Sequence, residues 1–248
     1  ATVIALDMAH GGIRWQRQLG RQLFTELPSP SGDILVVANG LLYVNAQTTI
    51  LALNAQNGFP AWQTAPGQVA ETYDSLMVTA GRFYVIAHAD GRQYVKSFDA
   101  LRGNSPRALQ GLDGALAGDL AFAGGMVYAL TNANLGSAGP YQYILSAIDP
   151  SSGSVLWTYK SSGSGIQLRI TNGQAIIAYE TTNVQGKNIE GIQAVNLQTH
   201  AGGWQRVLHQ GTQQTITFTL LNGNIYTASS AGTLTALRAT DGTILWPK

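Results

Sequence analysis

The sequence contains no cysteine among its 248 residues. This absence excludes disulfides, thiolate metal ligands and cysteine nucleophiles, but it leaves the redox compartment open. Charged residues are also scarce, at 11%, where soluble domains usually have roughly 25%. Because the formal net charge is only +1, we expect no basic surface for a nucleic-acid partner.

Long apolar runs are missing as well. No run approaches the roughly 20 residues that span a bilayer, and no charged and then apolar signal peptide opens the chain. Because Ala1 already lies inside a repeat, we expect the chain to be cut from a longer precursor. A β-rich chain without cysteine that is poor in charge and rich in Gln, Asn and Thr resembles bacterial extracytoplasmic domains in composition, so we expect that location.

In place of these features the sequence has a hairpin motif that occurs six times. In the copy at 146–157, Asp149 can bond the backbone of its own turn and Gly153 can adopt a positive φ without a Cβ clash, so the chain reverses between two apolar runs. The turn residues are Asp7, Asn54, Asp99, Asp149, Asn196 and Arg238. Their spacing of about 42 to 50 residues is typical of a propeller blade or a solenoid unit.

Two further positions make the motif specific. A glycine follows the turn residue by four positions in five copies (Gly11, Gly58, Gly103, Gly153 and Gly242), and His200 replaces it in the sixth. A tryptophan follows by eight positions in five copies (Trp15, Trp62, Trp157, Trp204 and Trp246), and the copy at Asp99 has Arg107 instead. These are all the tryptophans of the chain, so we predict a structural role in which each ring fills the gap between adjacent blades and its indole N–H donates to a turn carbonyl.

The repeat predicts an all-β propeller of four-stranded antiparallel blades. Turn pairs between apolar runs, such as Asn39-Gly40 and Asn222-Gly223, join the first two strands of each unit, A and B. We expect one domain over 1–248, with a two-stranded half-blade at 1–19 and five complete blades at about 33–64, 74–109, 118–159, 165–208 and 213–248.

The motif Ala-x-Asp-x-x-x-Gly-x-x-x-Trp resembles the PQQ-like β-propeller repeat over essentially the whole chain. That family is named for quinoprotein dehydrogenases, and the resemblance implies that the tryptophans dock on neighbouring blades. Within that family the chain most resembles the non-catalytic branch, whose members in the bacterial cell envelope act as binding or scaffold surfaces. We therefore expect no enzyme, no cofactor, and another protein or a peptide segment as partner, with a second chain able to complete the half-blade.

The alternative is a fragment of a PQQ-dependent sugar or alcohol oxidoreductase. Dehydrogenases of that kind have a vicinal disulfide over the cofactor, a tryptophan floor and a calcium site. The absence of cysteine and the placement of every tryptophan in the repeat weigh against this alternative.

Binding is expected on the long connections between strands B and C and between strand D and the next blade, because variable loops on a rigid scaffold commonly carry function. The candidate partner contacts are Phe24, Tyr73, Tyr141, Lys187 and Glu190. Catalytic and metal-binding residues are not expected, because His10, His88, His200 and His209 come from different repeats. The carboxylates Glu26, Glu71, Glu180 and Glu190 are interpreted as solvated loop charges, with contact to a ligand as the alternative.

Overall fold

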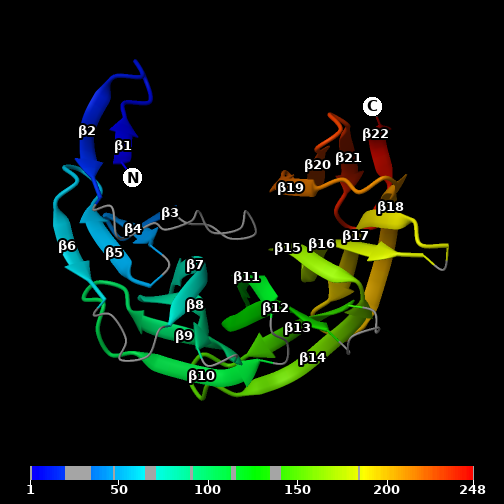
Figure 1. The fold of residues 1–248 in the computed structure, drawn as a ribbon, viewed down its shortest axis with the longest axis horizontal. Coiled ribbons are helices and arrows are strands. Elements are labelled where there is room, and N and C mark those ends of the chain that lie inside the picture. The colour runs from blue at the N-terminus through cyan, green and yellow to red at the C-terminus, as the bar shows by residue number, and fades with distance from the viewer. Residues whose placement is uncertain are drawn as a thin grey trace. The chain divides into compact units, whose positions relative to one another are not determined.

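The computed structural model describes residues 2–19, 35–46, 48–64, 71–89, 92–112, 116–134, 141–183 and 185–247. Within these ranges the protein consists of β-strands joined by turns, and they contain no helix (Figure 1). No helix in them is therefore long and apolar enough to cross a membrane. The chain divides into two compact units, Ala1–Gly111 and Leu112–Lys248.

The first unit holds a two-stranded sheet and two four-stranded sheets, each with its strands in sequence order. The two-stranded sheet is β1 (Thr2–Leu6) and β2 (Ile13–Gln18). The next sheet is β3 (Leu35–Ala38), β4 (Leu41–Asn45), β5 (Ile50–Asn54) and β6 (Pro60–Gln63). The last is β7 (Thr72–Thr79), β8 (Arg82–Ala89), β9 (Arg92–Asp99) and β10 (Arg107–Leu112).

The second unit holds three four-stranded sheets of the same kind. They are β11 (Leu116–Ala123), β12 (Met126–Asn134), β13 (Tyr141–Ile148) and β14 (Val155–Ser162); β15 (Ser164–Thr171), β16 (Gln174–Thr182), β17 (Asn188–Asn196) and β18 (Gly202–Gly211); and β19 (Ile216–Leu221), β20 (Asn224–Ser229), β21 (Leu234–Arg238) and β22 (Ile244–Pro247). The neighbouring strands of these three sheets pair antiparallel, as do β1 and β2, which confirms the predicted four-stranded blades and the half-blade. The assignment of all blades to a single domain stays a prediction.

The turns have the backbone conformations that the motif predicts. Gly153 has φ 76°, and the glycine four residues after the turn residue is also positive in φ in the other copies. His200 adopts φ 60° at the same position, so this copy keeps the turn without glycine. The side chain of Asp149 accepts a hydrogen bond from the backbone N–H of Ser151 at 2.8 Å. These local bonds explain why the hairpins form where the motif occurs.

A backbone hydrogen bond joins the two tight turns of a sheet. The carbonyl of Gly40, between strands A and B, accepts from the N–H of Ala55, between strands C and D, at 2.9 Å. The same bond joins Gly81 to Ala100, Gly173 to Leu197 and Gly223 to Ala239. In the β11–β14 sheet the residue at the donor position is Pro150, which has no N–H to give.

The cores lie where neighbouring sheets of one unit meet. The third strand of the β3–β6 sheet is buried on both faces, as the apolar pattern predicts: Ile50, Leu51, Ala52 and Leu53 of β5 are all buried. In the first unit Trp62, Phe83 and Phe98 form a stacked aromatic series, with ring centroids 5.4 Å and 4.7 Å apart.

The tryptophan of one sheet packs on the turn between strands C and D of the following sheet, which we call the docking turn. A Cβ added to Gly58 would lie 2.6 Å from the Trp15 ring, and one added to Gly103 would lie 2.3 Å from the Trp62 ring. Trp204 packs in the same way on Gly242. Trp157 stacks on His200 with ring centroids 4.5 Å apart. The contribution of these contacts to stability stays a prediction.

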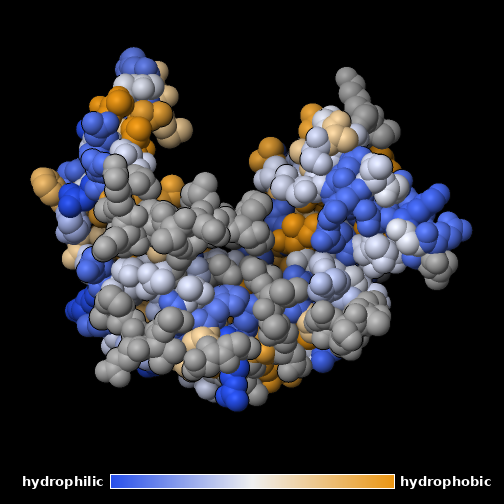
Figure 2. Space-filling model, viewed as in Figure 1, coloured by the Kyte–Doolittle hydropathy of each residue, from blue (hydrophilic) through white to orange (hydrophobic). Residues whose placement is uncertain are grey.

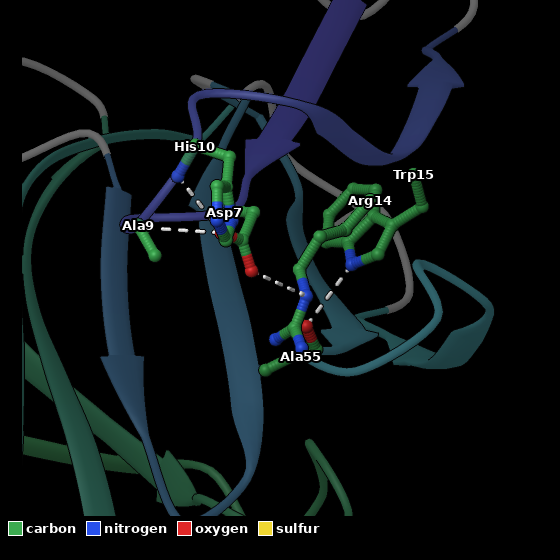
Figure 3. A network of polar contacts seen from close by, with 6 residues as sticks. All are labelled: Asp7, Ala9, His10, Arg14, Trp15 and Ala55. Atoms are coloured by element: carbon green, nitrogen blue, oxygen red, sulfur yellow. Dashed lines mark hydrogen bonds and ion pairs between the residues drawn. The ribbon is translucent and has the colours of Figure 1, made fainter.

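The indole N–H groups differ in their acceptors. Trp15 donates to the carbonyl of Ala55 at 3.0 Å (Figure 3), and Trp204 donates to the carbonyl of Ala239 at 3.1 Å. The N–H of Trp62 is buried and has no acceptor among the described residues. The equivalent carbonyl, that of Ala100, accepts instead from the hydroxyl of Tyr43 at 2.9 Å, so the expected turn acceptor is occupied.

Glu71 lies in a buried polar cluster of the first unit, and its interpretation as a solvated loop charge is wrong. Its carboxylate accepts hydrogen bonds from Tyr73 at 2.7 Å, from Lys96 at 2.6 Å and from Tyr94. Burial alone would raise the pKa of Glu71, but these hydrogen bonds and the charge of Lys96 outweigh it and lower the pKa below its ordinary value.

We expect Glu71→Gln to lower the free energy of unfolding by about 2 kcal/mol at pH 7, because hydrogen bonds to the charged carboxylate are lost. A carboxylate with a lowered folded pKa stabilises the protein above the ordinary carboxyl pKa, and this stability is lost as the pH falls through the folded value. The difference between the variant and the native chain should therefore shrink below about pH 4. Urea melts at several pH values measure it.

The matched control is Lys96→Met, which leaves the Glu71 carboxylate buried without its cation. This variant should be most destabilised at neutral pH and should recover in acid, where the carboxyl is protonated. A loss in Glu71→Gln that stays the same from pH 7 to acid would contradict the assignment of an ionised Glu71.

Candidate binding surface

The loop end of a sheet is the end at which strand B leads into strand C and strand D leads to the next sheet. In the second unit its described connections include 183 with 185–187, 212–215 and 230–233. These connections are held by their own hydrogen bonds. The side chain of Asn183 accepts from the N–H groups of Gln185 and Lys187 at 2.9 Å and 3.0 Å. The N–H of Ser229 donates to the carbonyl of Thr233 at 2.9 Å.

A small groove opens at this end between the β15–β18 and β19–β22 sheets. Its cavity volume is only about 30 Å³, room for one or two water molecules. Its lining is mixed: Leu208, His209, Gln214, Ile216, Thr227, Ser229, Thr233 and Thr235. Hydroxyl, amide and imidazole groups therefore face a shallow space that suits the polar end of one side chain and is too small for a cofactor.

Glu190 lies fully buried on β17 beside this groove. One of its carboxylate oxygens accepts from the backbone N–H of Gln214 at 2.9 Å, and the other has no partner among the described residues. His209 is the cross-strand partner of Glu190 and lies within hydrogen-bonding distance of the Gln214 amide, at 3.1 Å. The carboxylate thus fixes the connection that carries Gln214.

The structure separates the residues that sequence reasoning grouped as partner contacts. Tyr141, 47% exposed, begins β13, and Lys187 is exposed in the β16–β17 connection, so both are available to a partner. Phe24 lies outside the described residues, as does Glu26. The use of Tyr141, Lys187 and Phe24 as partner contacts stays a prediction.

The expected exposure of Tyr73 and Glu190 is wrong. Tyr73 is 2% exposed, donates to Glu71, and packs edge-on against Phe98. Glu190 is 0% exposed because the neighbouring connection covers it. Neither side chain is a surface contact, although Glu190 supports the groove from within.

Sequence reasoning missed the polar groove residues. Gln214, Thr227 and Thr233 have no position in the repeat motif that marks them, and hydroxyl and amide residues are common throughout this chain. The one available signal was the position of Gln214 in a connection from strand D to the next blade, where binding residues were expected.

Two turn carboxylates of this unit are engaged in local hydrogen bonds. The backbone N–H and the hydroxyl of Ser151, with the Ser152 hydroxyl, hold the pKa of Asp149 at about 2. In Asp241 the backbone N–H and the hydroxyl of Thr243 have the same effect, with a pKa of about 2. In the described parts of the chain, no group of three His, Cys, Asp or Glu side chains could hold a metal ion.

The comparison with protein families gives a match over residues 1–248 to the family described as outer membrane protein assembly factor BamB. The comparison with curated protein sequences gives no match.

Several solved structures share the fold. The crystal structure of BamB from Moraxella catarrhalis has 14% sequence identity and a TM-score of 0.55, and the match covers 96% of this chain and 65% of that one. A chain of the mitotic checkpoint complex has 11% identity and a TM-score of 0.62, with coverages of 88% and 65%. The Cps50 (Swd1) β-propeller domain of Myceliophteria thermophila has 10% identity and a TM-score of 0.63, with coverages of 100% and 80%.

The chain thus spans 65% of the length of the first two of these structures. At these identities the likeness establishes the β-propeller fold and no more. The family match covers the whole sequence and coincides with the repeated hairpins and their tryptophans. The chain belongs to the outer membrane protein assembly factor BamB family.

Proposed function

We propose that this chain is a non-enzymatic propeller of the bacterial cell envelope that binds other proteins during outer membrane protein assembly. The observation that carries the proposal is the family match over residues 1–248, because the family is described by that role. The composition supports it, since a cysteine-free chain that is poor in charge is typical of bacterial extracytoplasmic domains.

The loop end of the second unit is the proposed contact surface. It combines an exposed aromatic ring on Tyr141, an exposed cation on Lys187, and the polar groove around Gln214. Aromatic side chains supply much of the energy of protein interfaces, and the internal bonds of the Asn183 turn reduce the entropy lost on binding. A protein segment that places one polar side chain end in the groove fits this surface.

The edge of β1 is a second proposed contact. In the described residues β1 pairs with β2 alone, so its other edge has backbone groups without a neighbouring strand. Unpaired strand edges accept strands from other polypeptides. A second chain that adds strands here would complete the half-blade.

The alternative role, in a PQQ-dependent oxidoreductase, does not fit the residues present. The chain has no cysteine for a vicinal disulfide. Trp15, Trp62 and Trp204 pack against docking turns, so their faces are not free to form the floor of a cofactor site.

The test is to express the chain in the periplasm of a bacterium that lacks its own family member and to measure outer membrane proteins in the membrane fraction. We expect the native chain to raise their amount and Tyr141→Ala combined with Lys187→Glu to reduce this effect severalfold, because the central aromatic and the cation are lost. The matched control is Leu156→Ala, which removes an exposed apolar side chain from β14.

Equal effects of the native chain and the Tyr141/Lys187 variant would overturn the contact surface. A folded, periplasmic native chain that leaves the amount of outer membrane proteins unchanged would count against the role itself.

A further inference from the structure

The Glu190 carboxylate is fully buried, and in the described part of the chain no cation forms an ion pair with it. One oxygen accepts from the N–H of Gln214, and the other has no partner among the described residues. Lys187, three positions earlier, is exposed, and the cross-strand partner His209 contacts the Gln214 amide and the Thr212 carbonyl. A buried charge is costly unless it is compensated, so Glu190 favours a cation nearby.

The groove between the β15–β18 and β19–β22 sheets adjoins this carboxylate. Two residues that line it, His209 and Gln214, are the cross-strand partner and the hydrogen-bond partner of Glu190. Its volume of about 30 Å³ accommodates one or two water molecules. An ammonium group is compact, whereas a guanidinium group is a wider planar fork. Among cationic side chains of proteins, the groove therefore suits the end of a lysine.

The groove also supplies acceptors, which an ammonium group needs because it has three donors and no acceptor. The buried Thr227 hydroxyl donates its proton to the carbonyl of Thr235 at 3.3 Å, so its lone pairs remain for an incoming donor. The Ser229 hydroxyl accepts from the N–H of Thr233 at 3.2 Å and keeps a second lone pair. These two hydroxyl groups can therefore accept from the same cation.

The groove is accessible from the loop end and has an apolar part for the stem of a lysine. Thr233, which lines the groove, and Thr212, two residues before Gln214, are exposed. Leu208 and Ile216 also line the groove, and lysine side chains commonly pack their methylene groups on such apolar surface. Figure 2 shows hydrophilic residues, in blue, where β16 leads into β17 at this end of the sheet. A charged partner segment thus meets a polar surface around the groove.

We propose that the groove binds the ammonium end of a lysine side chain carried by a protein partner. The proposal rests on the proposed contact surface at this loop end and names the side chain that the surface recognises. Thr227 and Ser229 accept from the ammonium group, and Leu208 contacts the methylene stem. The negative charge of Glu190 favours this cation over a neutral side chain, as charge complementarity does at protein interfaces.

Titration of the full chain with capped single amino acids, followed by nuclear magnetic resonance, tests the proposal. Capped lysine should shift the backbone and side-chain amide signals of Gln214 saturably, with the weak affinity expected of a single side chain. Capped norleucine, which lacks the ammonium group, should leave them unchanged. Capped arginine should bind at least about tenfold more weakly than capped lysine, because its guanidinium group is too wide for the groove. No shift with lysine, or equal shifts with norleucine, overturns the proposal.

Two variants test the residues that carry the site. Glu190→Gln keeps an oxygen for the N–H of Gln214 but removes the charge, and Thr227→Val removes the hydroxyl acceptor. Each should weaken the binding of capped lysine at least about tenfold. Thr217→Val is the matched control, because Thr217 is exposed on the other face of β19 and does not line the groove.

Unchanged lysine binding in both Glu190→Gln and Thr227→Val would show that the groove holds water alone, and the proposed lysine site would be wrong. The titration uses no outer membrane protein, so its outcome is independent of the proposed role in assembly. A chain that binds lysine here but leaves the amount of outer membrane proteins unchanged would keep the site and lose the role.

Discussion

Trp204→Ala should lower the free energy of unfolding by about 3 kcal/mol, since truncating a large aromatic ring leaves a cavity between packed sheets. The ring lies against Gly242, and its N–H donates to Ala239, so both packing and a hydrogen bond are lost. Denaturant melts followed by circular dichroism measure the effect. A loss below about 1 kcal/mol would show that the contact contributes no more than an ordinary surface position.

Phenylalanine separates the two contributions. Trp204→Phe keeps most of the ring but loses the bond to Ala239. It should therefore lower the free energy of unfolding by about 1 kcal/mol more than Trp62→Phe, since the Trp62 N–H has no acceptor among the described residues. If the two phenylalanine variants lose equal stability, the indole hydrogen bond adds nothing to docking.

Gly242→Ala should lower the free energy of unfolding by about 3 kcal/mol, because two separate free-energy costs add up. A non-glycine residue at φ +69° costs about 1 to 2 kcal/mol, and the new Cβ would lie 2.3 Å from the Trp204 ring, which forces the neighbouring sheet to shift. Thermal and urea melts of the variant give the total.

Gly223→Ala is the control for backbone strain. Gly223 has φ +75° and no described atom within 4 Å of an added Cβ, so this variant should cost only the backbone term of about 1 to 2 kcal/mol. The excess in Gly242→Ala then measures the close approach of the ring. Equal losses in the two variants would show that the ring moves aside without cost.

The sheets could be predicted from the sequence because their signals are local. Turn residues such as Asp149 and Gly153 act within a few positions, and strand alternation is set by neighbouring residues, so the hairpins lie where the motif places them. Glycine at the fourth position is not required for the turn, because His200 adopts the same positive φ there.

Burial of the candidate site residues could not be predicted in the same way. Tyr94 and Lys96 reach Glu71 from a strand more than 20 residues away, and Gln214 reaches Glu190 from the next sheet's connection. These contacts depend on register and packing between elements, which no local pattern records. That the Trp62 N–H finds no acceptor in the described part of the chain has a similar cause, because the Tyr43 hydroxyl of the preceding blade donates to the Ala100 carbonyl.

The bond between the two tight turns of a sheet, as between Gly40 and Ala55, has an evolutionary consequence. It fixes one end of the sheet through backbone atoms, which almost any side chain leaves intact. Connections at the opposite end can then gain, lose or exchange residues without moving a strand out of register. Descendants of one ancestral propeller can therefore diverge until little sequence is shared, inherit the same sheets, and still acquire different binding partners.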